Sequence, residues 1–322
     1  MKKITALKFM ALGILGSFLL TSCSDDNDSS TTVTPTPKTI AGVATSDPQF
    51  SILVQALQKA DLVTTLNGAG PFTVFAPTNT AFTKFLSDKG FASLDVVPTP
   101  DLKEILLNHV VSGNVPSTAL SAGYIKTLAK GSASATNNLS MYVDLRDGVK
   151  LNGVAKVTTA NVAASNGVVH IVDAVIDLPN IVTFAKSNPD FSILVSALTR
   201  TDMPDFAGIL SGAGSFTVFA PNNTAFGNLL TELGVAGLAD INTATLENTL
   251  KYHVVANANV LSGSLTEGQE VTTFQGGTFT IGLTGGAKIT DLNNRISNIV
   301  AVDVQAANGV IHVIDKVILP VL

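Results

Sequence analysis

The sequence predicts a mixed α/β (α+β) fold arranged as two tandem domains, and three observations support this. First, GAGPFTVFAPTNTAF at 68–82 returns as GAGSFTVFAPNNTAF at 212–226, with thirteen of the fifteen positions identical. Second, apolar residues recur at helical spacing near the start of each copy. Third, each copy ends in short apolar segments separated by turn residues, a pattern typical of β-strands.

The duplication extends along most of the chain. Three further pairs repeat in the same order: PQFSILVQAL (48–57) as PDFSILVSAL (189–198), HVV (109–111) as HVV (253–255), and NGVVHIVDAVI (166–176) as NGVIHVIDKVI (308–318). These offsets of 141 to 144 residues are too long for a solenoid repeat and match the size of whole domains. We therefore expect domain 1 over 39–178 and domain 2 over 179–322, with so short a connection that the domains touch.

The first half of each domain is predicted to hold helices around one strand. The segment 50–57 places apolar residues at i, i+3, i+4 and i+7, and 191–198 repeats this stripe. A glycine turn at 68–70 then precedes a predicted strand at 72–76. Thr78 follows the proline that ends this strand and is placed to cap a short helix, as Asn222 is in domain 2.

A further helix and several strands complete each domain. Thr99-Pro100 predicts a helix start with proline at the first helical position, and His109 would share the apolar face of that helix. His253 is expected in the same place in domain 2. The remaining predicted strands are two hairpins (141–144 with 149–151, and 278–283 with 287–290) and two final apolar strands (168–176 and 310–319).

These motifs resemble the fasciclin domain family. The more specific motif, TVFAP-x-N-x-A-F, is present at 73–82 and 217–226, and the second, N-G-V-I-H-x-I-D, is matched at 166–173 and 308–315. The resemblance covers about Ile40 to Leu322. It implies two compact modules, each a two-sheet β-sandwich or wedge with helices packed at its edge. It also implies a role in adhesion or extracellular interaction without catalysis.

Residues 1–22 are predicted to be a lipoprotein signal peptide. A basic start precedes a twelve-residue apolar run at 9–20, which is too short to span a bilayer and suits a signal-peptide core. The run ends in Leu-Thr-Ser-Cys23, which resembles the bacterial lipoprotein cleavage box and implies acylation of Cys23. Cys23 is the only cysteine in the chain, so it has no disulfide partner. The alternative is an ordinary residue beside a secretory signal.

The segment 23–38 is expected to be an acylated, disordered tether. Ser24, Asp25, Asp26 and Asp28 resemble the signal that sends lipoproteins of some Gram-negative bacteria to the cell surface, with a solvated acidic linker as the alternative. The Ser, Thr and Pro residues that follow bury too little apolar surface to fold. The predicted location is therefore the bacterial outer membrane, with a lipid anchor and exposure at the cell surface.

Composition limits the classes of partner. A hydrophobic content of 46% with 13% charged residues allows two sizeable cores. The net charge is −5, and −8 without residues 1–22, which argues against nucleic acid as a partner. The absence of Trp and the presence of only three Tyr leave little material for an aromatic sugar-binding platform.

The histidines and two asparagines are expected to be structural. The four histidines, His109, His170, His253 and His312, fall at matching positions of the two domains. A metal site would need them to converge with other ligands. We expect hydrogen-bonded core histidines, with metal ligation and a binding surface as alternatives, and we expect no cofactor. Asn79 and Asn223 each follow a strand-ending proline, where an amide can satisfy backbone groups of a loop.

The sequence offers little for catalysis. It contains neither the G-x-S-x-G elbow of many hydrolases nor a glycine-rich phosphate loop, so an enzyme is not expected. In animal fasciclin proteins a Tyr-His pair is linked to integrin contact. Only Tyr252-His253 matches it here, since domain 1 has Asn108-His109. Tyr252 and His253 are therefore contact candidates, unless they lie in the core.

The sequence thus predicts a non-catalytic cell-surface adhesion or interaction lipoprotein. Its partners would be the membrane, through Cys23, and a protein or glycan on cells or matrix. One alternative is a glycan-binding accessory lipoprotein for polysaccharide capture, which the low aromatic content disfavours. Another is a structural component of the envelope.

Overall fold

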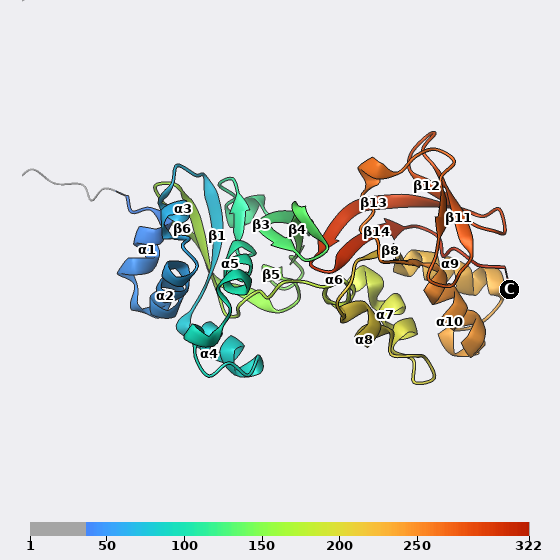
Figure 1. Cartoon of the computed structure of the whole chain (residues 1–322), viewed down its shortest axis with the longest axis horizontal. Helices are drawn as coiled ribbons and strands as arrows, with labels where there is room; N and C mark the ends of the chain where they lie inside the picture. The colour runs from blue at the N-terminus through green and yellow to red at the C-terminus, as the bar shows by residue number, and fades with distance from the viewer. Residues whose placement is uncertain (1–36, 322) are drawn as a thin grey trace, which may run out of the picture. The chain divides into compact units, whose positions relative to one another are not determined.

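The computed structural model describes residues 37–321 (Figure 1). The predicted signal peptide and the residues expected to direct anchoring and export, Cys23, Ser24, Asp25, Asp26 and Asp28, lie outside the described residues. Among the residues that are described, no helix has both the length and the apolar character needed to cross a membrane.

Domain 1 contains five α-helices and seven strands. The helices are α1 (Ile40–Ser46), α2 (Ser51–Lys59), α3 (Val63–Asn67), α4 (Asn79–Asp88) and α5 (Thr99–Leu107). The strands are β1 (Phe72–Pro77), β2 (Val110–Ser112), β3 (Gly123–Gly131), β4 (Ser134–Asp144), β5 (Lys150–Leu151), β6 (Ala155–Ala164) and β7 (Gly167–Val172).

Domain 2 repeats this order as far as residue 321. Its helices are α6 (Ile181–Ser187), α7 (Ser192–Leu198), α8 (Phe206–Ser211), α9 (Asn223–Leu233) and α10 (Thr243–Tyr252). Its strands are β8 (Phe216–Pro221), β9 (Val254–Ala256), β10 (Glu270–Thr272), β11 (Thr278–Gly282), β12 (Lys288–Thr290), β13 (Ile296–Ala306) and β14 (Gly309–Ile314).

The seven strands of each domain form one hydrogen-bonded series. The order is β2-β1-β7-β6-β5-β4-β3 in domain 1 and β10-β11-β12-β13-β14-β8-β9 in domain 2. Only the β1–β7 and β8–β14 pairs are parallel. Register shifts within β6 and β13 mark bulges, which bend a sheet and increase its twist. The mixed α/β fold of two tandem domains predicted from the sequence is confirmed.

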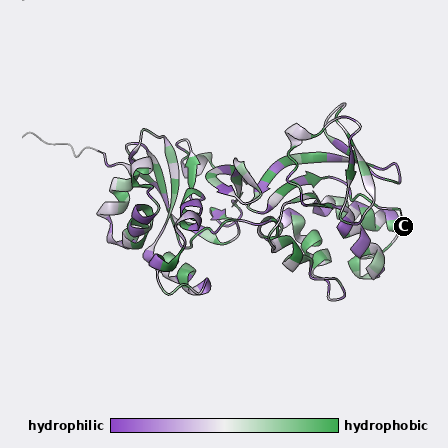
Figure 2. Cartoon of the chain, in the orientation of Figure 1, coloured by the Kyte–Doolittle hydropathy of each residue, from purple (hydrophilic) through white to green (hydrophobic). Residues whose placement is uncertain are grey.

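Apolar side chains fill two cores in each domain, one on each side of the bent sheet. In domain 1 the helices cover one core, and a second core lies around Phe75, Met141 and Ile176. Domain 2 has an equivalent pair of cores. Figure 2 shows the corresponding pattern: β14 carries mostly hydrophobic residues, whereas the helices have one hydrophobic and one hydrophilic side.

Local structure agrees with several sequence predictions. The Thr78 hydroxyl accepts a hydrogen bond from the Ala81 N–H at the start of α4, and Asn222 caps α9 in the same way. The predicted hairpins form, with β4 much longer than expected because it also pairs with β3.

Two predicted element ends need correction in each domain. The helix expected to reach His109 ends at Leu107, with Pro100 at its second position, and α10 ends at Tyr252, so His109 and His253 each lie just beyond a helix. The strands expected over 168–176 and 310–319 end at Val172 and Ile314. The N–H of Ile176 donates instead to the ring of His109, at 2.8 Å, so it is not available to a strand partner.

The two domains meet through the β3–β4 hairpin of domain 1. Tyr142 of β4 is buried within the helix-covered core of domain 2. The Tyr124 ring packs edge-on against Phe184 of α6, with centroids 5.5 Å apart, and its hydroxyl accepts a hydrogen bond from Asn188. At Gly131 there is no room for a side chain, because an added Cβ would lie 2.4 Å from the Ala307 Cα.

Hydrogen bonds donated by backbone N–H groups also join the domains. The Ala133 N–H donates to the Ala307 carbonyl at 2.8 Å. The buried Gln305 N–H donates to the Ser140 hydroxyl at 3.0 Å. These contacts, together with the two tyrosines, lead us to expect the domains to unfold as one coupled unit.

Replacing Tyr142 with alanine should uncouple the domains. Removing a buried aromatic side chain costs about 3 kcal/mol or more, and here the loss falls on the junction. We expect one calorimetric transition for the wild type and two for Tyr142→Ala. The matched control is Tyr142→Phe, which keeps the ring and should keep one transition. A single, unshifted transition in Tyr142→Ala would show that the junction does not couple the domains.

Candidate functional site

His109 and His253 link the end of a helix to the last buried segment of their domain. In each ring Nδ1–H donates to a backbone carbonyl at 2.7 Å, that of Ile105 or Thr249. Nε2 accepts the N–H of Ile176 at 2.8 Å in domain 1 and that of Ile318 at 3.2 Å in domain 2. Burial lowers the pKa of both rings to about 4, so both are neutral at pH 7.

His170 and His312 lie on the last strand of each domain. Nε2 of each ring donates to a backbone carbonyl, that of Val115 at 3.0 Å or Val260 at 2.9 Å. Each ring stacks on the phenylalanine of the neighbouring parallel strand, with centroids 5.4 Å and 5.3 Å apart. Burial lowers the pKa of both imidazoles.

His170 and His312 differ in the hydrogen bonding of their second ring nitrogen. Nδ1 of His170 accepts the Asn161 N–H at 3.2 Å, whereas the buried Nδ1 of His312 has no partner among the described residues. Between residues 37 and 321 there is no group of three or more His, Cys, Asp or Glu side chains placed to hold a metal ion. The four histidines thus occupy separate, hydrogen-bonded positions in the cores.

Asn79 and Asn223 hold the start of one helix against the start of another. Asn79 Oδ1 accepts the Ile52 N–H, and its Nδ2 donates to the Pro48 carbonyl and the Ser51 hydroxyl, all at 2.9 to 3.0 Å. Asn223 makes the equivalent three hydrogen bonds in domain 2. Each amide therefore satisfies backbone groups at the entry to the second helix of its domain.

Tyr252 and His253 lie in the core of domain 2, the alternative that the sequence left open, so they do not form a contact surface in this structure. Tyr252 is 0% exposed and His253 is 4% exposed. The Tyr252 hydroxyl donates to the Thr278 carbonyl at 2.5 Å, and its ring packs edge-on against Phe279. The physical reason is that Tyr252, the last residue of α10, packs into the second core of domain 2, and His253 directly follows the helix.

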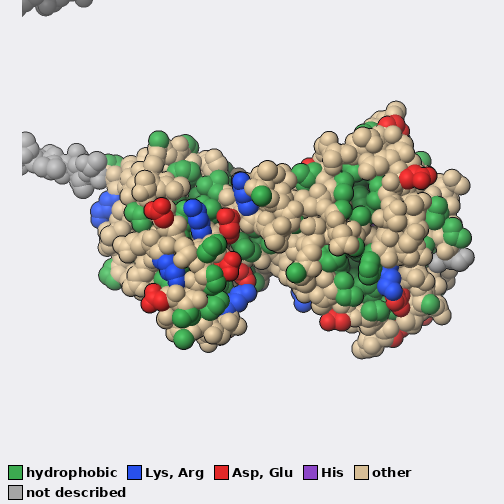
Figure 3. Space-filling view, in the orientation of Figure 1, with side chains coloured by type: hydrophobic (Ala, Val, Ile, Leu, Met, Phe, Trp, Pro, Cys, Tyr) green, Lys and Arg blue, Asp and Glu red, His purple; other side chains and the backbone are tan. Residues whose placement is uncertain are grey.

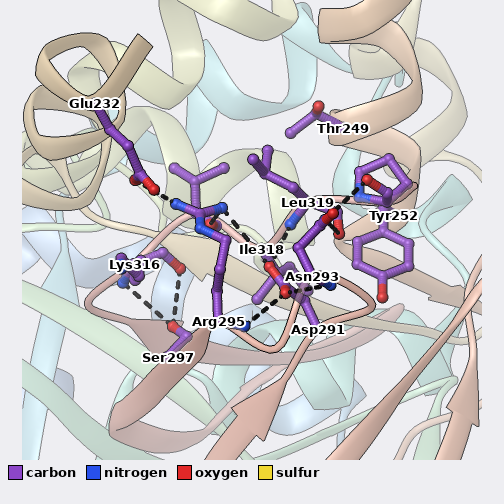
Figure 4. Close-up of polar contacts among 12 residues, drawn as sticks. Glu232, Thr249, Tyr252, Asp291, Asn293, Arg295, Ser297, Lys316, Ile318 and Leu319 are labelled. Carbon is purple, nitrogen blue, oxygen red and sulfur yellow. Dashed lines mark hydrogen bonds and ion pairs between the residues drawn. The ribbon is translucent and has the colours of Figure 1, made fainter. Parts of the chain in front are cut away.

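An ionic cluster beside Tyr252 was not predicted from the sequence (Figure 4). The fully buried Asp291 carboxylate accepts hydrogen bonds from the N–H groups of Asn293, Arg295 and Leu319, each at 2.9 Å. The Arg295 guanidinium donates to Glu232 at 2.6 Å and to the Val317 carbonyl at 3.0 Å. The cluster therefore ties the final segment, 317–319, to α9 and to the β12–β13 loop.

Domain 1 lacks this cluster. The loop between β12 and β13 (291–295) is longer than the loop between β5 and β6 (152–154), and the shorter loop contains neither an aspartate nor an arginine. The partners of the cluster come from three distant segments of the chain, so the cluster could not be predicted from the spacing of its residues in the sequence.

One exposed apolar surface distinguishes domain 2. Ile296, Val300 and Val302 of β13 are 53%, 56% and 44% exposed. The repeat places Val154, Thr158 and Ala160 at the same positions of domain 1, so that only the first of these is a large apolar residue. Figure 3 shows apolar side chains reaching the surface over β13. We call Ile296, Val300 and Val302 the β13 strip.

Comparison with known proteins identifies both halves of the chain. A family model described as the fasciclin domain matches residues 48–179 and again 189–320. Human periostin is 31% identical over 79% of this chain, and the matched region is 29% of the length of periostin. Protein sll1483 of Synechocystis is 40% identical over 44% of this chain and 75% of its own length.

A solved structure matches the pair of domains. It is a FAS1 domain pair from the insect cell adhesion molecule Fasciclin I, with a TM-score of 0.51 and 19% sequence identity. The match covers 85% of this chain and 97% of the other. At 19% sequence identity, this match shows a shared fold only.

The buried histidines predict that acid destabilises the protein. Each imidazole that stays neutral in the fold but binds a proton in the unfolded chain favours unfolding as the pH falls from 6.5 towards 4. A shift of this size in His109 or His253 is worth about 3 kcal/mol each once the pH reaches 4. We expect the free energy of unfolding, measured with urea, to fall over this window.

The variant His253→Gln isolates one of these groups. Its amide oxygen can still accept the Ile318 N–H, but it does not titrate. The fall in unfolding free energy between pH 6.5 and 4 should shrink by about 3 kcal/mol, the contribution of this one ring. An unfolding free energy that stays constant over this window in the wild type would contradict the assigned protonation states.

Proposed function

Because the chain belongs to the fasciclin domain family, we propose that it is a non-catalytic adhesion or interaction protein that presents two fasciclin domains at the cell surface. Fasciclin-domain proteins are generally proteins of adhesion or extracellular interaction. The observation that carries the proposal is the family match to both repeats. Fasciclin I, whose domain pair has the same fold, is described as a cell adhesion molecule.

The histidines support a role without catalysis. A general base needs a ring nitrogen within reach of a substrate proton. In His109, His170 and His253 both ring nitrogens bond to backbone groups of the core, and burial lowers the pKa of all three. These are the features of residues that stabilise a fold.

The β13 strip is the surface that best suits contact with a partner protein. Exposed apolar residues grouped on one strand provide the kind of area that the centre of a protein interface buries. Val300 and Val302 are more than two fifths exposed, whereas the Tyr-His pair is buried. The proposal therefore assigns the contact to domain 2.

The anchor belongs to the same proposal. The lipoprotein motif ending at Cys23 would hold the protein at the outer membrane, and Ser24, Asp25, Asp26 and Asp28 would direct it to the cell surface. The tether that follows would separate the domains from the membrane. Many copies on one surface make weak individual contacts effective, because the later contacts form at high local concentration.

A binding experiment tests the contact. The fragment Lys38–Leu322, which contains all of the described helices and strands, is measured against whole cells, matrix proteins and a glycan panel. We expect saturable binding to cells or to a matrix protein. The double variant Val300→Thr, Val302→Ala introduces the residues that domain 1 carries, and it should weaken binding about tenfold because it removes apolar contact area.

The control is Ile209→Thr, which removes an exposed apolar residue of α8, away from β13. The equivalent residue of domain 1 is Thr65, so this variant also introduces the residue type that domain 1 carries. It should leave binding unchanged. Selective binding to glycans would replace the proposal with a glycan-binding accessory lipoprotein. Absence of any binding, together with a crosslinked partner in the envelope, would replace it with a structural role.

The anchor has its own test. Cys23→Ala removes the thiol that acylation needs, so we expect the protein to leave the membrane fraction as a soluble or unprocessed form. The measurement is fractionation of cells followed by a high-salt wash. The control is Ser24→Ala, which leaves Cys23 intact and should remain in the membrane fraction. A Cys23→Ala protein that stays bound after the wash would disprove the lipid anchor.

A further inference from the structure

Domain 2 contains an apolar crevice beneath its first three helices. Its walls come from α6, α7, α8 and the strands β8 and β14, and its cavity volume is about 40 Å³. Among the lining residues, polar side-chain groups belong only to Lys186, Thr199 and His253. Figure 3 shows apolar side chains gathered at the surface over α7, where the crevice lies.

Two of these three polar side chains are already engaged. The Thr199 hydroxyl donates to the Val195 carbonyl, and both ring nitrogens of His253 bond to backbone groups. The exposed Lys186 ammonium makes no ion pair or hydrogen bond with any side chain or carbonyl in the part of the chain that the structure describes. No lining residue is acidic. The crevice is therefore an apolar slot with a single cation near its edge.

Domain 1 offers an internal comparison. The equivalent cavity is about 20 Å³ and its lining includes no lysine or arginine. The repeat places Thr45 at the position of Lys186, and Val63 at the position of Ala207. Thr45 and Val63 line a separate surface hollow of domain 1 and are absent from its inner cavity. Ala207, with its smaller side chain, does line the crevice of domain 2.

We propose that the domain 2 crevice binds an aliphatic carboxylate, with the chain end in the apolar slot and the carboxylate beside Lys186. A site for one water needs about 10 to 15 Å³, so the cavity has room for a few carbon atoms of a chain. An apolar lining without free hydrogen-bonding groups favours hydrocarbon over water there. The positive charge at the edge selects an anionic head over a neutral or cationic one.

The inference does not depend on the proposed adhesion role. The ligand chemistry is shared by a free fatty acid and by the acyl chains of an anionic phospholipid. The deep part of the slot holds only the end of a chain, so the remainder would lie along the mouth of the crevice.

A titration with short carboxylates tests the site. Butanoate, hexanoate and octanoate are added to the fragment Lys38–Leu322, and methyl NMR shifts are followed. We expect saturable shifts confined to residues around the crevice, such as Val195, Ala207 and Leu210. Affinity should rise about fourfold for each added CH₂ until the slot is full, because that is the effect of burying one methylene.

Residues of domain 1 provide the matched variants. Ala207→Val should abolish or strongly reduce binding of octanoate and of octanol alike, because it narrows the slot. Lys186→Thr should weaken octanoate about threefold and leave octanol unchanged, as expected for one partly solvated charge pair. Octylamine should bind more weakly than either. The circular dichroism spectrum and the melting temperature of each variant verify that it folds.

Three results would overturn the proposal. One is the absence of saturable shifts, and another is equal shifts in domain 1 and domain 2. The third is unchanged octanoate binding in a folded Ala207→Val protein. Vesicles of phosphatidylglycerol separate the two sources. If the vesicles displace octanoate and the protein sediments with them, the site is assigned to membrane lipid. If the vesicles do not displace octanoate, the site is assigned to a free fatty acid.

Discussion

The parallel pairing of an early strand with the last strand closes each domain, and the rest of the structure depends on it. Gly167 and Gly309 make that pairing possible, since a Cβ at these positions would lie 1.9 Å and 2.2 Å from the carbonyl oxygen of Phe72 or Phe216. Both glycines also have positive φ angles, of 152° and 157°. The preceding asparagines, Asn166 and Asn308, bind the first helix and the turn after the third helix of their domain.

The remaining duplicated residues reinforce this closure. His109 and His253 hold the segment that follows the last strand, and His170 and His312 stack on the strand parallel to it. The two motifs shared with the fasciclin family are therefore explained by folding alone. Since the repeated residues stabilise the fold, features that serve a particular partner or ligand must be sought where the two copies differ.

The sequence predicted the parts of the fold that local patterns determine. The helical stripe at 50–57, the proline after β1 and the caps at Thr78 and Asn222 each act within a few residues. The helix end near His109 was not predicted correctly, and the sequence left open whether Tyr252 lies in the core, because both depend on where a distant segment packs. The Asp291 cluster and the tyrosines of the junction were missed for the same reason: their partners are at least 60 residues away in several contacts.

Residues that differ between the two copies lie at the junction in domain 1 and on exposed surfaces in domain 2. Domain 1 carries Tyr124, Gly131 and Tyr142 at the junction, where they place its β3–β4 hairpin against domain 2. Domain 2 carries the exposed β13 strip and the larger crevice edged by Lys186. A hairpin committed to the junction is not available to an outside partner, whereas the surfaces peculiar to domain 2 remain open. Both proposed binding surfaces therefore belong to domain 2, whereas the distinctive residues of domain 1 named here lie at the junction.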